Sequence, residues 1–200
     1  KEFAPALEPA PERSEADAVF LQVDYEVDPP WPVSADGGGH SLVLARPSYG
    51  EGDVRAWAAS AQIDGSPGRD EPYTSDPLDN VVINEYLTHT DPPLEDYVEL
   101  YNHGNQAVNI SGAYITDEAN RTNQFQIPNP TIIPAGGYIS FVISTNTAGF
   151  ALSSAGERIY LFNSNRTRII DSVKFGAQEN GISTGRSPDG ANAWSRMAAL

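Results

Sequence analysis

Three carboxylates crowd one predicted loop of this sequence and are its strongest candidates for binding a metal ion. Asp91, Glu95 and Asp96 lie close together in an acidic, proline-containing loop, and Asp117 and Glu118 follow in a later turn. Calcium takes roughly six to eight oxygen ligands, which carboxylates and loop carbonyls supply. The spacing matches neither an EF-hand nor an Asp-rich repeat, and solvated loop charges are the alternative explanation. The sequence gives Asp91, Glu95 and Asp96 as a calcium hypothesis and predicts no other cofactor.

A second group of carboxylates raises the question of acid–base catalysis. Glu85 and Glu99 fall on neighbouring predicted strands, where paired carboxylates could transfer protons. Both are flanked by alternating apolar residues, which favours side chains that face solvent or bond turn groups. The three histidines, His40, His89 and His103, show no metal-ligand spacing. No nucleophile elbow or glycine-rich phosphate loop occurs, so we expect no enzyme activity.

Exposed aromatic side chains offer a third kind of chemistry, the stacking of sugar rings. Trp31, Trp57, Trp194, Tyr49 and Tyr73 could form such a platform, which makes a glycan a possible partner. The alternative is that a tryptophan near the end of each β-rich unit fills its core. A glycan array distinguishes the two interpretations.

Composition narrows the classes of partner and the compartment. The formal net charge is -15, and such a field repels nucleic acid and anionic lipid while it favours cationic partners. The chain has no cysteine, which excludes disulfides and thiolate sites and is compatible with export from a bacterium. No apolar run is long enough to insert into a membrane. Because the sequence starts at Lys1 and its one methionine is Met197, we expect a piece of a larger extracellular or cell-surface protein.

Beyond residue 80 the pattern is one of short β-branched and aromatic runs separated by Gly, Pro and Asn turns. Predicted strands cover residues 81–87, 97–101, 107–110, 113–116, 124–127, 138–143, 157–162 and 168–175. No window shows a sustained helical period. Many short strands at this spacing favour an all-β fold, an immunoglobulin-like antiparallel β-sandwich. The predicted two-sheet core consists of Val82, Val98, Leu100, Phe125, Ile139, Phe141, Ile159, Leu161, Val173 and Phe175.

The region before residue 80 predicts an additional β-rich half-module. Residues 1–18 predict an extended arm, residues 19–25 and 40–44 predict strands, and residues 64–79 predict a linker. The order of motifs in this region repeats near the end of the chain. Gly-His-Ser, Arg-Pro and Arg-Ala-Trp, ending at Trp57, correspond to Gly-Ile-Ser, Arg-Ser-Pro and Asn-Ala-Trp, ending at Trp194. The region before residue 80 is therefore interpreted as the closing half of a second copy of the β-rich unit that follows residue 80.

Collinear motifs between residues 80 and 197 resemble the lamin-tail domain as it occurs in bacterial surface and secreted proteins. The motifs are Val82-Ile83-Asn84-Glu85, Tyr97-Val98-Glu99-Leu100-Tyr101-Asn102, Tyr114-Ile115-Thr116-Asp117, Ile133-Pro134-Ala135-Gly136-Gly137-Tyr138, Gly156-Glu157-Arg158-Ile159-Tyr160-Leu161 and Gly185-Arg186-Ser187-Pro188-Asp189-Gly190. The resemblance implies an immunoglobulin-like sandwich and supplies no catalytic residues. We therefore divide the chain into residues 1–78, with the arm, the partial copy and the linker, and residues 79–200, the complete domain.

The expected function is that of a non-catalytic interaction or spacer module, which contacts a protein partner or holds neighbouring domains apart. One alternative is a carbohydrate- or calcium-binding accessory module of an extracellular enzyme whose catalytic part lies elsewhere. The partial copy poses a packing problem, because a few strands expose both an apolar face and an edge. We expect it to pack on the complete domain or to pair with another molecule.

Overall fold

The computed structural model of the chain describes residues 22–28, 30–71, 76–120 and 125–197. Within these ranges the regular structure is strand, with short 3-10 helices and no α-helix. None of the described helices is long or apolar enough to cross a membrane. The 3-10 helices are η1 (Val33–Ala35), η2 (Pro47–Tyr49), η3 (Val54–Ala56) and η4 (Pro77–Asn80). The prediction of an all-β chain is confirmed.

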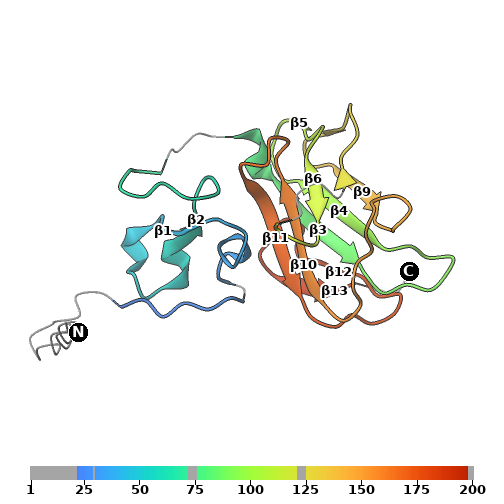
Figure 1. Cartoon of the computed structure of the whole chain (residues 1–200), viewed down its shortest axis with the longest axis horizontal. Helices are drawn as coiled ribbons and strands as arrows, with labels where there is room; N and C mark the ends of the chain where they lie inside the picture. Colours follow the sequence, from blue (N-terminus) through green and yellow to red (C-terminus); the bar gives the residue numbers. More distant parts are fainter. Residues whose placement is uncertain (1–21, 29, 72–75, 121–124, 198–200) are drawn as a thin grey trace, which may run out of the picture.

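Two antiparallel sheets face each other across the core (Figure 1). The four-stranded sheet has the order β11-β10-β6-β7, with β11 (Ile169–Phe175), β10 (Glu157–Phe162), β6 (Tyr114–Thr116) and β7 (Phe125–Gln126). The five-stranded sheet has the order β13-β12-β3-β4-β9, with β13 (Trp194–Arg196), β12 (Thr184–Arg186), β3 (Val81–Leu87), β4 (Tyr97–Asn102) and β9 (Tyr138–Val142). A short ribbon of β5 (Val108–Asn109) and β8 (Ile132–Ile133) closes one end.

The strands form where β-branched and aromatic residues alternate with polar ones. In β4 the side chains of Val98 and Leu100 are completely buried, while those of Tyr97, Glu99 and Tyr101 face outward. Buried aliphatic residues from both sheets fill the space between them, among them Ile83, Leu100, Ile115, Ile159 and Leu161. Burial of each such side chain stabilises the fold by roughly 1.5–3 kcal/mol.

The predicted core is correct except at one strand. Val98, Leu100, Ile159, Leu161, Val173 and Phe175 are buried, and Phe125, Ile139 and Phe141 pack partly buried against them. Val82 was expected in the core, but the structure places Val81 and Ile83 there instead. A register irregularity between Ile83 and Glu85 sets which residues of β3 face inward.

The N-terminal segment, residues 22–71 apart from 29, packs against the four-stranded sheet (Figure 1). Its hairpin joins β1 (Leu42–Leu44) and β2 (Trp57–Ala59). The backbone N–H of Ile63 donates to Thr167 O over 2.9 Å, and Ile63 packs against a cluster that includes Tyr160 and Phe162. Of the two expected arrangements, the chain adopts the one in which the N-terminal segment packs on the sandwich of the same chain.

Two expectations for the N-terminal region are wrong. Of the strand predicted at 19–25, residues 19–21 lie outside the described residues, and residues 22–25 are irregular. An isolated extended segment has no neighbouring strand to accept or donate its backbone hydrogen bonds. Its β-prone composition alone is therefore not sufficient to form a strand. Part of the predicted linker is also folded, because Glu71 accepts hydrogen bonds from Ala61 N–H and Ser66 Oγ. The division at 78/79 falls inside η4 and stays a prediction.

Candidate interaction surface

The outer face of the five-stranded sheet carries an ordered group of tyrosines and carboxylates, which we call the open face. The cross-strand register places Glu85 of β3 directly opposite Glu99 of β4. The hydroxyl of Tyr97 donates to Glu85 Oε1, and Ser140 Oγ lies 3.3 Å from Glu99 Oε2. The two carboxylates that the sequence suggested as a pair are therefore neighbours, and each is held by polar partners.

A buried asparagine fixes this group to the turn after β12. Asn84 Nδ2 lies 3.0 Å from Asp189 Oδ1 and 3.4 Å from Glu99 Oε1, while Asn84 Oδ1 accepts the N–H of Gly190 over 3.0 Å. Tyr138 donates its hydroxyl to Asp189 Oδ2 over 2.7 Å. Asn84 is 1% exposed, so these bonds hold the face in one arrangement.

The protonation of these carboxylates follows from their contacts. Hydrogen bonds from Asn84 and Tyr138 lower the pKa of Asp189. Burial raises the pKa of Glu99, and the neighbouring charges of Glu85 and Asp189 act in the same direction. Burial, together with the bond to Glu85, also raises the pKa of Tyr97. The open face thus combines fixed negative charge with tyrosine rings, which suits a cationic surface more than an anionic one.

Arg186 is the centre of a structural network at the edge of this face. Its side chain is 6% exposed and donates from Nε to Ile83 O over 2.8 Å and from Nη2 to Asp171 Oδ2 over 2.9 Å. Asp171 belongs to β11 of the other sheet and also accepts the N–H of Ile83. The guanidinium lies 4.7 Å from the ring centre of Trp194. Arg186 therefore ties the two sheets together, a role that sequence reasoning did not assign.

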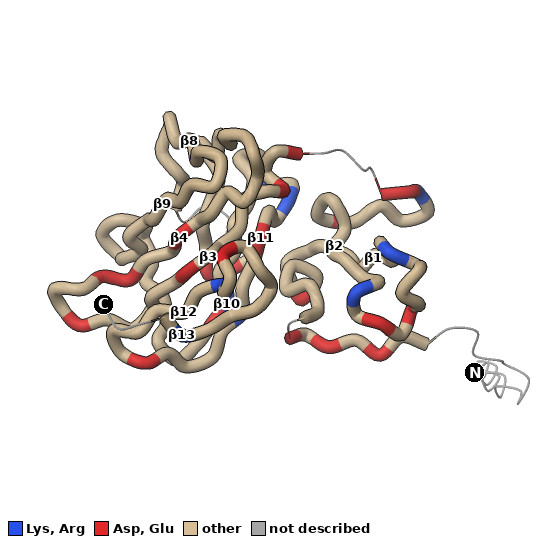
Figure 2. The backbone as a smooth tube through the Cα atoms, turned by 180° about the vertical axis from the view of Figure 1, so that it is seen from behind, with Lys and Arg blue, Asp and Glu red and all other residues tan. Residues whose placement is uncertain are grey.

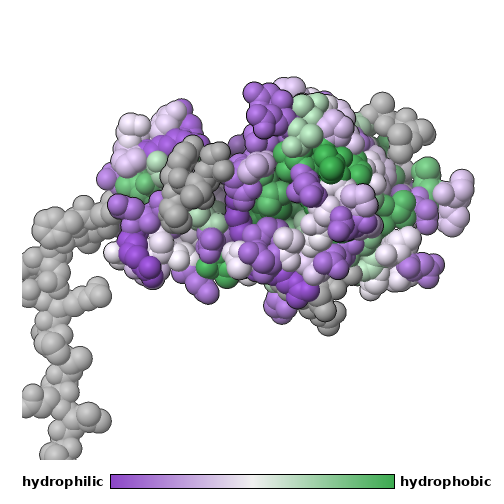
Figure 3. Space-filling model, turned by 90° about the horizontal axis from the view of Figure 1, so that it is seen from above, coloured by the Kyte–Doolittle hydropathy of each residue, from purple (hydrophilic) through white to green (hydrophobic). Residues whose placement is uncertain are grey.

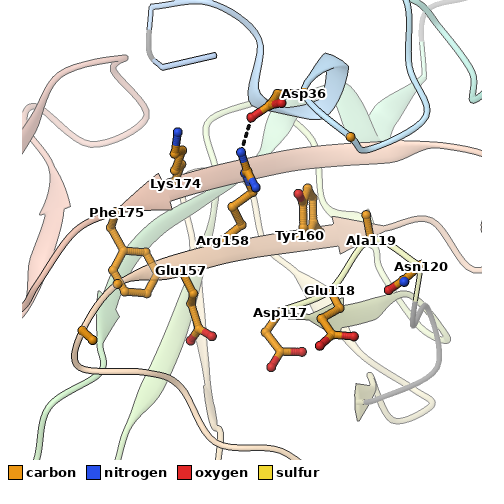
Figure 4. A pocket seen from close by; sticks show the side chains of 13 residues that line it. Asp36, Asp117, Glu118, Ala119, Asn120, Glu157, Arg158, Tyr160, Lys174 and Phe175 are labelled. Carbon is orange, nitrogen blue, oxygen red and sulfur yellow. Dashed lines mark hydrogen bonds and ion pairs between the residues drawn. The ribbon is translucent and has the colours of Figure 1, made fainter.

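A pocket of about 690 Å³ lies where the N-terminal segment meets β10 and β11 (Figure 4). Asp36 from the N-terminal segment forms an ion pair with Arg158 on one side. Glu157, Asp117 and Glu118 also line the pocket, and in Figure 4 their carboxylates point away from Asp36. Burial raises the pKa of Glu157 to about 7, and the negative charge of Asp117 adds to that effect. The sequence did not reveal this pocket, because its walls come from segments far apart in the chain.

The proposed calcium ligands are brought into one loop but are bound to protein groups. Asp91 Oδ2 accepts Asn180 Nδ2 over 2.6 Å, and Asp96 Oδ1 accepts Thr90 Oγ1 over 2.8 Å. Burial raises the pKa of Asp96, and Glu95 is exposed. Among the described residues no group of three or more His, Cys, Asp or Glu side chains is arranged to hold a metal ion. The calcium hypothesis on Asp91, Glu95 and Asp96 stays a prediction.

The five candidate aromatic residues do not share one surface where they are described. Trp194 packs 5.5 Å from Tyr86 between ring centres, on the sandwich. Trp57 lies in the N-terminal segment and donates its indole N–H to Glu51 O. Trp31 and Tyr49 also belong to that segment, and Tyr73 lies outside the described residues. Binding of a glycan stays a prediction.

His40 is the histidine with a defined role. It is buried, with Nδ1 2.7 Å from Ser60 O and Nε2 accepting the N–H of Ile169 over 2.9 Å. Those partners require a neutral ring with its proton on Nδ1. Burial lowers the pKa of His40, and the positive charge of Arg168 acts in the same direction. His40 thus links the N-terminal segment to the backbone of β11.

These observations define the class of protein as an immunoglobulin-like sandwich domain with one covered outer face and one open face. The sequence model of the lamin tail domain family matches residues 74–177, so the chain belongs to the lamin tail domain family. The family consists of non-catalytic immunoglobulin-like modules that bind other proteins. The matched range contains β3 to β11 and stops before β12 and β13. No curated protein matches the chain.

Proposed function

We propose that this chain is a non-catalytic interaction and spacer module of a larger bacterial protein exported to the cell surface or medium. Its open face is the surface that contacts a cationic protein partner. The observation that carries this proposal is the fixed array of Glu85, Glu99 and Asp189, held by Asn84 and Tyr138. Groups already held in their bound geometry lose little entropy on binding. The net charge of -15 favours the approach of a basic surface.

Binding of a defined cationic probe tests the open face. The probe is a synthetic peptide of alternating arginine and valine residues, and its affinity is measured by calorimetry. We expect Glu99→Gln combined with Asp189→Asn to weaken binding roughly fivefold or more, which corresponds to about 1 kcal/mol. The control combines Glu51→Gln with Asp70→Asn, two exposed sites of the N-terminal segment with the same change of net charge. Equal weakening in both double variants would mean that only net charge matters and would contradict the proposed surface.

The spacer role rests on the contact between the two parts of the chain. His40 and Ile63 both form hydrogen bonds to the β10–β11 hairpin, and Lys174 Nζ lies 2.5 Å from Asp28 Oδ1. Two parts joined in this way keep a fixed separation. Limited proteolysis is the test, and we expect the segment to be cut no faster than the sandwich. Rapid loss of residues 1–70 with release of stable 79–200 would refute a rigid spacer.

The interpretation of the N-terminal segment as part of a second copy is supported by its hairpin. In β1 and β2 Leu44 pairs with Trp57, and in β12 and β13 Arg186 pairs with Trp194. In both hairpins the tryptophan is the first residue of the returning strand. We therefore propose a tandem array in which the end of one module packs on the four-stranded sheet of the next.

A further inference from the structure

Strand β9 is an open edge of the five-stranded sheet. Its only described neighbour is β4, on one side. The N–H of Asn102 donates to Gly137 O and the N–H of Ile143 donates to Asp96 O, which fixes the phase of the ladder. In an antiparallel ladder the backbone groups of successive residues point alternately toward the partner and away from it. Every second residue of β9 therefore directs its N–H and C=O outward.

The outward groups belong to Tyr138, Ser140 and Val142. Val142 O accepts the hydroxyl of Thr147 over 2.9 Å. The remaining outward N–H and C=O groups form no hydrogen bond within the described part of the chain. The side chains of Tyr138 and Val142 are 46% and 37% exposed. This edge offers both backbone partners and apolar surface to another strand.

The edge strand belongs to a long stretch of the sequence that contains no charged residue. The whole chain has 27 acidic and 12 basic residues, yet none occurs between residues 122 and 156, the range that contains β7, β8 and β9. Strands β5 and β6 are also free of charged residues. The tube through β8 and β9 is accordingly tan in Figure 2, and apolar atoms gather over the end of the sandwich that carries β5 and β8 (Figure 3).

Natural sheets protect their exposed edges with charged side chains, prolines or bulges. Strand β9 has none of these, since its sequence is Tyr-Ile-Ser-Phe-Val and its register with β4 is regular. The opposite edge of the sandwich, β11, is covered by the N-terminal segment through His40. An unprotected edge strand of this kind indicates that another strand pairs with it.

We propose that β9 pairs antiparallel with β9 of a second copy of this chain, centred on Ser140, so that two sandwiches share one continuous sheet. In this register Ser140 faces Ser140 of the partner subunit, and Tyr138 faces Val142 of the partner subunit. An aromatic residue opposite a β-branched one is a favourable cross-strand pair. The arrangement has twofold symmetry and closes on itself, so it forms dimers and not fibres.

Charge distribution selects a second copy as the occupant. Two copies with net charge -15 repel each other over most of their surfaces, and the uncharged flank is where they can approach. Two carboxylates of the open face lie beside β9, since Glu99 Oε2 is 3.3 Å from Ser140 Oγ and Asp189 Oδ2 accepts the hydroxyl of Tyr138. The Cα atoms of the two Glu99 residues would be about 14 Å apart, three strand spacings, and salt screens the repulsion between their carboxylates. A basic peptide, by contrast, would find no carboxylate on β9 itself.

Tyr138 is already held in place for this contact. Its ring stacks on Tyr101 with 4.5 Å between centres, and its hydroxyl is bound to Asp189. The open face proposed above and the β9 edge share Tyr138, but the edge uses backbone groups that the array does not. Dimerisation can therefore succeed or fail independently of the binding of a cationic partner.

Sedimentation velocity of the full chain tests the dimer, over concentrations from about 1 µM to about 1 mM. We expect the wild type to change from monomer to dimer in this range, and more readily as salt screens the acidic surfaces. Ser140→Lys places like charges opposite each other and should weaken dimerisation at least tenfold. Gln62→Lys adds the same charge at an exposed position of the N-terminal segment and should leave it unchanged. A wild type that stays monomeric throughout, or a Ser140→Lys variant that dimerises like the wild type, overturns the proposal.

A crosslink gives an independent measurement that also reports register. The chain has no cysteine, so Ser140→Cys introduces a unique thiol. Directly opposed residues in a hydrogen-bonded antiparallel pair have Cα atoms about 5.5 Å apart, within the range of a disulfide. Mild oxidation should crosslink Ser140→Cys at least tenfold faster than the matched Gln62→Cys. Equal crosslinking rates for the two variants would show that a second copy does not pair with β9. Binding of an added neutral peptide to β9 in a protein that forms no dimer would show the same.

Discussion

The two outer faces of the sandwich differ in their exposure to solvent, although each belongs to an antiparallel sheet. On the four-stranded sheet Tyr160 and Phe162 are 3% and 0% exposed, because Ile63 and the rest of the N-terminal segment cover them. On the five-stranded sheet Tyr97, Tyr101 and Tyr138 remain at the surface beside Glu85 and Glu99. The comparison shows that the N-terminal segment covers one face and leaves the other accessible, and the proposed function assigns the binding of a partner to the accessible face.

The largest expected difference between the faces is in stability. Phe162→Ala removes a completely buried ring beneath the N-terminal segment and should lower the free energy of unfolding by about 3–5 kcal/mol. Tyr138→Ala, on the open face, should lower it by less than about 1.5 kcal/mol. Chemical denaturation of both variants at low protein concentration is the measurement. If the two losses are alike, the faces are not differently buried in solution.

A loss of similar size is expected where the two sheets are joined. Arg186→Met leaves the carboxylate of Asp171 buried without its cation, which should cost about 3–5 kcal/mol of unfolding free energy. Arg196→Met breaks an exposed pair with Glu179 and should cost less than about 1 kcal/mol. Denaturant midpoints of the two variants decide the matter. An Arg186→Met variant as stable as Arg196→Met would show that the network does not hold the sheets together.

The covered face should respond to acid through His40. Folding requires the neutral ring, so the folded-state pKa lies below the 6.5 of free imidazole. At pH values between the folded-state pKa and 6.5, the unfolded chain binds more protons than the folded chain. The contribution of His40 to stability is therefore complete above pH 6.5 and decreases as the pH falls, by at most about 1.4 kcal/mol per pH unit. Arg168 and Glu71 are the charged groups that act on the ring.

Hydrogen exchange of the Ile169 amide, followed from pH 7.5 to 5, reports this effect directly. Exchange rates are compared after correction for their intrinsic pH dependence. In His40→Gln we expect the extra loss of protection in acid to disappear, while the exposed His103→Gln should behave as the wild type does. Protection that does not depend on pH in the wild type would contradict the neutral bridge.

The smallest of the expected effects on stability concerns Glu157, and here stability changes with pH in the direction opposite to that expected for His40. Burial raises its pKa to about 7 from 4.5, so the folded chain binds more protons in that window and stability falls as the pH rises through it. Glu157→Gln should raise stability at pH 8 by roughly 1 kcal/mol, since water screens the half-exposed carboxylate. It should have no effect at pH 4. Thermal melts at both pH values provide the test, and a destabilised variant at pH 8 would be the contrary outcome.

Much of the fold could be predicted because the strands have local signals. The predicted strands at 81–87 and 157–162 have the observed bounds, and the turn-prone residues Asn163, Ser164 and Asn165 begin the connection from β10 to β11. A signal for the covered face was also present. Ile159, Tyr160, Leu161 and Phe162 form a continuous apolar run, which is typical of a strand buried on both sides. The strict alternation in β4 indicates the opposite, one buried side and one exposed side.

The sequence by itself determined the all-β class, most strand positions between residues 81 and 175, the family and the pairing of Glu85 with Glu99, because alternation and turn residues act within a few positions. Only the tertiary structure decided that His40 bonds to Ile169, that Asn84 holds Asp189, and that Asp171 balances Arg186. Each of these contacts joins residues at least fifteen positions apart. Their geometry depends on how whole sheets pack and on which hydrogen bonds remain unsatisfied once they do.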